Sequence, residues 1–129
     1  MITMYAYYGE KMFCGEPESK WSKQLVEAEI EAGNDCAKAL DGLGFYLSSE
    51  YYPENNIEGM GLEVYSSHGS SDMSKEFSFL VAMSACDTSM QYILISDIPS
   101  LYNFLAKYLP VIKLANETMI DRETHYEQG

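Results

Sequence analysis

Two apolar segments in the second half of the chain, residues 77–83 and 90–95, constrain the fold more than any other feature. Large apolar side chains occupy every second position of the first segment, which is the period of an extended strand. These residues are Phe77, Phe79, Val81 and Met83. The polar residues 86–89 lie between the two segments and are typical of a turn. The pattern therefore predicts an antiparallel hairpin, and with it a fold that contains a β-sheet.

Three other segments have the composition or the alternation of strands. Residues 2–8 are β-branched and aromatic, residues 45–52 are rich in aromatic side chains, and residues 60–65 alternate apolar with other side chains. The polar and glycine- or proline-containing stretches beside them are predicted to be loops, at residues 9–19, 53–59 and 66–74.

A helical period is present between residues 20 and 43, where an apolar residue recurs about every 3.6 positions. The apolar positions are Trp21, Leu25, Ala28, Ala32, Cys36, Ala39 and Leu43. Gly33 falls inside this pattern, and a glycine in a helix costs ~1 kcal/mol relative to alanine. We expect one long amphipathic helix. The alternative is two helices, with Asn34 at the N-cap of the second.

A second amphipathic helix is predicted to begin at Asp97, whose side chain suits the N-cap, with Pro99 in the first turn. Pro110 is expected to end or kink it, because proline lacks the backbone N–H that a helix interior needs. Residues 111–120 are predicted to continue as a short helix, and the polar tail 121–129 is expected to be frayed.

These elements predict one α+β domain over residues 1–129, with no repeat or linker. We expect a four- to five-stranded, mainly antiparallel sheet with the two amphipathic helices packed on one face. The other face then needs cover of its own. Tyrosines at alternate positions are predicted to line that face, which is then either exposed to water or part of an interface. These tyrosines are Tyr5, Tyr7, Tyr46 and Tyr65.

The charge of the chain limits its partners. The 20 acidic residues outnumber the 8 basic ones, which gives a formal net charge of −12 at pH 7. Such a field repels nucleic acids and anionic membranes and attracts basic surfaces. We therefore predict no direct nucleic-acid binding and no membrane association, and a basic protein as the partner.

The cysteines and the amino terminus indicate the compartment. Cys14, Cys36 and Cys86 are isolated and odd in number, which is not the pattern of a disulfide framework. The first residues have no basic region followed by an apolar run, and no apolar run approaches the ~20 residues that span a bilayer. We expect a cytoplasmic protein.

No motif specifies a reaction. A cysteine nucleophile needs a histidine base, and Cys14 with His68 is the most plausible combination, although nothing in their spacing brings them together. Zinc binding would require cysteines and histidines in closely spaced pairs, and these residues occur singly. We expect a non-enzymatic protein with no catalytic residue, metal or cofactor, and an enzyme is the third interpretation after the two binding functions below.

Carboxylates recur at i, i+4 and i+8 in the first predicted helix, at Glu27, Glu31 and Asp35. Like charges at this spacing cost a few tenths of a kcal/mol per pair. One interpretation is a solvated helix face, partly neutralised by Lys23 and Lys38. The other is an acidic binding surface, to which a second acidic run around the 53–59 loop, Glu50, Glu54 and Glu58, would contribute. The candidate binding residues are therefore Glu27, Glu31, Asp35, Glu54 and Glu58.

The predicted function is that of an acidic binding protein that covers a basic surface of its partner. An immunity or antitoxin-like inhibitor, an inhibitor that mimics nucleic-acid charge and an acidic adaptor share this physics. The 11 tyrosines would supply contact area in each case. The alternative is a small-molecule binder with a pocket lined by tyrosine, methionine and phenylalanine, for a cationic ligand. Homodimerisation is compatible with either function.

Overall fold

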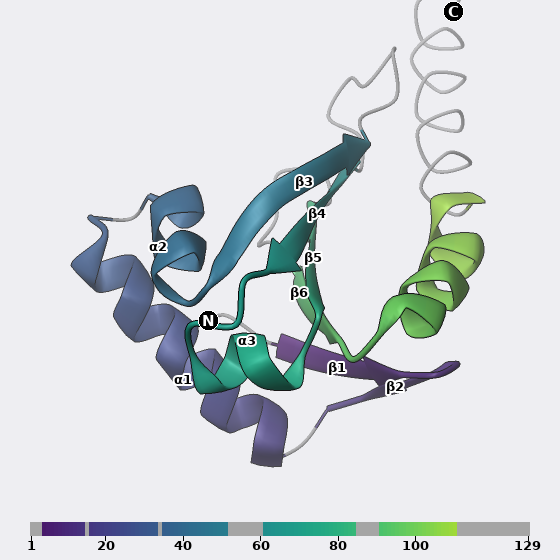
Figure 1. Cartoon of the computed structure of the whole chain (residues 1–129), viewed down its shortest axis with the longest axis horizontal. Coiled ribbons are helices and arrows are strands. Elements are labelled where there is room, and N and C mark those ends of the chain that lie inside the picture. The colour runs from purple at the N-terminus through teal and green to yellow at the C-terminus, as the bar shows by residue number, and fades with distance from the viewer. Residues whose placement is uncertain (1–3, 15, 34, 52–60, 85–90, 111–129) are drawn as a thin grey trace, which may run out of the picture.

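The computed structural model describes residues 4–14, 16–33, 35–51, 61–84 and 91–110, and these form one six-stranded sheet with helices around it (Figure 1). The strands are β1 (Met4–Tyr8), β2 (Lys11–Phe13), β3 (Phe45–Tyr51), β4 (Gly61–Ser67), β5 (Phe79–Ser84) and β6 (Gln91–Ile95). The helices are α1 (Glu16–Glu31), α2 (Cys36–Gly42), α3 (Asp72–Glu76) and a fourth over residues 98–110. Figure 1 draws the fourth helix in green at the right, and we call it helix 98–110.

The strand order is β2-β1-β6-β5-β4-β3, and the sheet is mixed. β1 runs parallel to β6, whereas the other neighbouring pairs are antiparallel. The α+β class is confirmed, but the expected four- to five-stranded sheet with two helices is wrong in its counts. The strand β2 lies in the predicted loop 9–19, and the helix α3 begins in the predicted loop 66–74 and ends two residues beyond it.

The predicted hairpin is confirmed as an antiparallel pair of β5 and β6, in which Val81 lies opposite Ile93. Its turn, residues 86–89, is outside the described residues. The expectation that Phe77 shares the strand face of Phe79 is wrong. Phe77 is the C-cap of α3 and is buried on the other side of the sheet.

Helices cover both faces of the sheet, which corrects the prediction that they share one face. On one face, Trp21 and Leu25 of α1 and Leu40 of α2 pack with the even-numbered residues of β5 and β6. On the other face, Phe104 of helix 98–110 packs with Val81, Ile93 and other odd-numbered strand residues. A sheet with both faces apolar needs such cover, because each exposed face would leave its side chains in water.

The four tyrosines expected on one face of the sheet are instead distributed over both faces and an edge strand. Tyr5 and Tyr7 do lie on the face that helix 98–110 covers. Tyr65 is buried on the opposite face, and Tyr46 is exposed on the edge strand β3. The prediction of a single tyrosine face is therefore wrong.

The first predicted helix is interrupted at Gly33, so the single long helix is wrong and the two-helix alternative is correct. Gly33 has φ +67°, a left-handed conformation that glycine adopts readily and that ends α1. The N-cap of α2 is Asp35, not Asn34, and its side chain accepts a hydrogen bond from the Lys38 backbone N–H at 3.2 Å.

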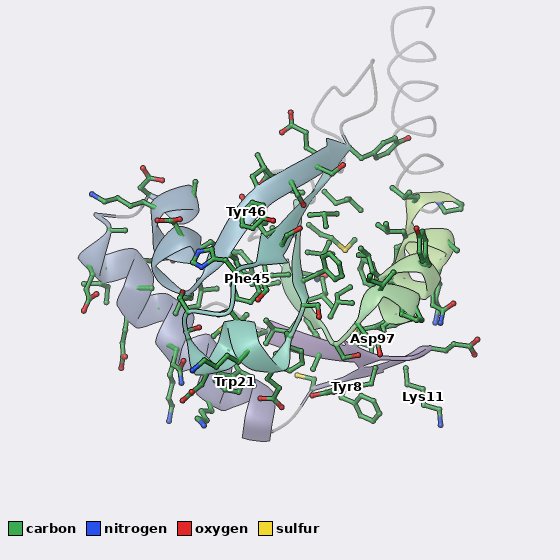
Figure 2. The ribbon with its side chains drawn as sticks, in the orientation of Figure 1. Tyr8, Lys11, Trp21, Phe45, Tyr46 and Asp97 are labelled. Carbon is green, nitrogen blue, oxygen red and sulfur yellow. The ribbon has the colours of Figure 1, made fainter. Side chains whose placement is uncertain are left out.

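Helix 98–110 begins as the sequence predicts. The Asp97 carboxylate accepts a hydrogen bond from the Ser100 backbone N–H at 2.9 Å, which is N-cap geometry. Asp97 lies beside the β1–β2 hairpin that carries Tyr8 and Lys11 (Figure 2). The expected helix 111–120 and the tail 121–129 are outside the described residues.

Candidate binding surface

An open groove lies where α1 and α2 meet, and its volume is about 640 Å³. Small side chains leave this space, because its lining includes Ala28 on α1, Ala32 in the turn that follows α1, and Ala39 on α2. The complete lining consists of Gln24, Glu27, Ala28, Glu31, Ala32, Lys38, Ala39, Gly42 and Leu43. We call this feature the α1–α2 groove.

Two of the predicted binding residues, Glu27 and Glu31, line the α1–α2 groove and are exposed. They are one helical turn apart on α1 and therefore lie next to one another on its surface. One basic residue, the exposed Lys38 of α2, lines the same groove. Its single positive charge offsets one of the two carboxylates, so the lining residues keep an excess of one negative charge. Lys23, one helical turn before Glu27, is exposed on α1 outside the groove lining.

An exposed apolar pair lies beside these carboxylates on the same helix. The side chain of Ile30 is 71% exposed and that of Val26 is 38% exposed. At 100° per residue, Glu27 lies between the groove and Ile30 around the circumference of α1. A helix surface that combines two carboxylates with two aliphatic side chains can attract a basic partner and also bury apolar area against it.

This apolar pair was not predicted from the sequence, because it lies outside the helical period of the residues that face the core. Val26 and Ile30 are separated by four positions, as the core residues Trp21 and Leu25 are, but they lie on the solvent side of α1. Two aliphatic residues at i and i+4 outside the predicted buried face were the signal that could have revealed it.

In a continuous helix, Asp35 would extend the row that Glu27 and Glu31 form. In the structure it does not. It lies after the turn at Gly33, where its carboxylate caps α2. Its first role is therefore structural, although the side chain is exposed. The two other candidates, Glu54 and Glu58, lie outside the described residues.

The sheet order separates the two groups considered for catalysis. Cys14 follows β2 at one edge, and His68 follows β4 near the other edge, four strand positions away. Neighbouring strands in a sheet are about 4.8 Å apart, so four such spacings separate the strands that these two residues follow. The ring of His68 instead stacks on Tyr46, with centroids 6.1 Å apart.

The described part of the chain contains no group of three or more histidine, cysteine, aspartate or glutamate side chains arranged to hold a metal ion. Nor does any helix within it combine the length and the apolar composition needed to cross a bilayer.

In comparisons with known proteins, no protein-family model, no curated protein and no solved structure matches the chain. The class that the fold and the surface define is therefore a mixed α+β protein with an acidic, partly apolar helix surface.

Proposed function

We propose that this protein is a non-enzymatic binding protein that covers a basic surface of a protein partner. The observation that carries the proposal is the solvent side of α1, where Glu27 and Glu31 lie between the α1–α2 groove and the exposed pair Val26 and Ile30.

The two kinds of side chain contribute differently to binding. The carboxylates, with the net charge of −12, steer a basic partner toward the protein and raise the association rate. The aliphatic pair and the alanine floor of the groove give apolar area that is removed from water on binding. A stable interface buries about 800 Å² on each partner, so the partner would extend from the groove across the exposed side of α1.

An immunity or antitoxin-like inhibitor, an inhibitor that competes with nucleic acid for a basic site, and an acidic adaptor all use this arrangement. We propose that the protein acts in the cytoplasm, which the isolated cysteines support. Among the three versions the inhibitors fit best, because a groove with carboxylates at its rim can accept a protruding basic side chain.

The test is capture of a partner from host lysate on the immobilised full-length chain, followed by mass spectrometry. The wild type is compared with a Glu27→Lys/Glu31→Lys variant. The matched control is Glu50→Lys/Glu76→Lys, which changes the net charge equally at exposed positions on β3 and α3. The control should fold, because Glu50 lies directly opposite Glu63 on β4 and a lysine there replaces a repulsive pair with an attractive one.

We expect one basic protein that is retained by the wild type and by the control but lost from the Glu27→Lys/Glu31→Lys variant. Retention of the same protein by all three chains would show that another surface binds it. Absence of any basic protein from all three eluates would reject the proposed function.

A further inference from the structure

A second hollow, of about 360 Å³, lies on the opposite side of the sheet from the α1–α2 groove. It is formed where the β1–β2 turn meets helix 98–110, and it is lined by Tyr7, Glu10, Asn103, Ala106 and Lys107. We call it the Tyr7 hollow. A role for this hollow is independent of the proposed function, because none of its residues belongs to the α1 surface.

The walls of the Tyr7 hollow are fixed by hydrogen bonds to both backbone groups of one residue. The Gly9 N–H donates to the Ser100 hydroxyl at 2.7 Å, and the Gly9 carbonyl accepts from the Asn103 side-chain amide at 3.0 Å. The turn is thereby held against the helix at two points one helical turn apart. A ligand would meet a preformed site, which lowers the entropy cost of binding.

Tyr7 has a buried hydroxyl that lacks a partner among the residues that the structure describes. Its side chain is 1% exposed, and its ring packs edge-on against Phe104 with centroids 5.4 Å apart. Within those residues no hydrogen bond involves the Tyr7 hydroxyl, and this residue lines the hollow. A buried hydroxyl without a partner is unfavourable, so a group that enters the hollow and accepts its proton is stabilised there.

The hydroxyl is present as a donor. Burial, followed by the nearby Tyr108 and Glu10, raises the pKa of Tyr7 above its usual value of 10.0. Tyr7 therefore keeps its proton throughout the physiological range, and the group that it binds must be an acceptor.

The other polar groups around the hollow carry opposite charges. Glu10 offers a carboxylate, and Lys107 offers an ammonium whose Nζ lies 5.7 Å from the centre of the Tyr108 ring. Asn103 uses its amide nitrogen on Gly9, which leaves its side-chain oxygen available as an acceptor. A ligand of a single charge would meet one like charge here, whereas a ligand with both charges can pair with both residues.

We propose that the Tyr7 hollow binds a small amphoteric molecule of amino-acid size. Its carboxylate accepts from the Tyr7 hydroxyl and pairs with Lys107, and its amino group pairs with Glu10 and the Asn103 side-chain oxygen. The size follows from the volume of the hollow, which is near the lower limit of ligand sites in proteins.

The test uses the isotope-labelled full-length chain and adds each of the common free amino acids in turn, with amide chemical shifts as the readout. We expect at least one of them to shift the amides of residues 7–10 and 103–107 in a saturable manner. Ethylamine and acetate, which each carry only one of the two charges, should bind more weakly than that amino acid.

The Tyr7→Phe variant should weaken the binding roughly tenfold, since it removes one hydrogen bond to a charged group. The matched control is Tyr102→Phe on the same helix, where the side chain is 70% exposed and the affinity should not change. The exposed Lys107→Glu provides a second variant if Tyr7→Phe does not fold, and it should also weaken the binding. Failure of every amino acid to shift these amides, or equal affinity of Tyr7→Phe and the wild type, would overturn the proposal.

Discussion

At the scale of single residues, Gly44 is the position where the backbone allows least change. It joins α2 to β3 with φ +93°, in the left-handed region that L-residues with a side chain avoid. A β-carbon added there would lie 2.8 Å from Cβ of Ser74 and too close to the hydroxyls of Ser70 and Ser74. Ser70 in the loop before α3 and Ser74 within α3 pack on this glycine, so both the conformation and the space require it.

We therefore predict that Gly44→Ala lowers the free energy of unfolding by about 2–4 kcal/mol, from the left-handed strain and the overpacking together. Gly42→Ala is the matched control, because the structure places nothing within 4 Å of a β-carbon there. It should be neutral or stabilising. Urea unfolding of the two variants measures this difference, and equal midpoints would contradict the packing described for the loop.

The N-cap Asp97 makes stability depend on pH. Hydrogen bonds from the Ser100 hydroxyl and then from its backbone N–H lower the pKa of the Asp97 carboxyl below its usual value. A carboxyl whose pKa is lower in the folded state stabilises the protein above its unfolded pKa, and this contribution is lost as the pH falls through the folded pKa.

The Asp97→Asn variant should keep an oxygen at the cap but lose the titration. We expect its melting temperature to be lower than that of the wild type at neutral pH, with the gap closing as the pH falls below the usual aspartate pKa of about 4 and through the lowered pKa of Asp97. Thermal unfolding from pH 7 to pH 2 measures the gap. A gap that is constant over this range would show that the charge of Asp97 does not act on the helix.

At the scale of elements, the strands and helices that were predicted are those that a local sequence pattern marks. Alternating apolar residues marked β4 and β5, β-branched and aromatic composition marked β1 and β3, and Asp97 marked the start of helix 98–110. The helix α3 was missed because its capping box pairs Ser71 with Ser74, where a glutamate or glutamine is usual, inside a run of serines. The strand β2 was missed because it has three exposed residues and is held by pairing with β1.

The arrangement of the elements was predicted less well, because it depends on contacts between distant segments. The parallel pairing of β1 with β6 joins two segments that are far apart in the sequence, and no local pattern encodes it. For the binding surface, the spacing of Glu27 and Glu31 was sufficient to place them together. The position of Asp35 depended on how the backbone turns at Gly33.

Helix 98–110 closes the second face of the sheet through Phe104, which is fully buried and packs on both Tyr7 and Tyr108. We predict that Phe104→Ala costs about 3–5 kcal/mol of unfolding free energy, as a large buried aromatic does. Tyr102→Ala on the solvent side of the same helix should change it by less than about 0.5 kcal/mol. Similar losses for the two variants in chemical denaturation would show that this face is not a packed core.

At the scale of the whole molecule, the net charge of −12 and the surface of the fold together determine which association is favoured. The charge repels a second copy of the chain at long range, while the apolar pair on α1 favours any partner that neutralises the carboxylates beside it. Homodimerisation stays a prediction. A basic partner is the association that both features favour.

The most direct test of the binding surface is the affinity of the captured basic protein for three chains, measured at low and at high salt. These are the wild type, Glu27→Lys/Glu31→Lys and the Glu50→Lys/Glu76→Lys control. Because the Debye length is ~10 Å at 0.1 M salt, only charges close to the partner should have a large effect. We predict a loss of about 100-fold or more for the α1 variant and of about tenfold or less for the control, with the difference reduced at high salt. Equal losses for the two variants would contradict the assignment of α1 as the binding surface.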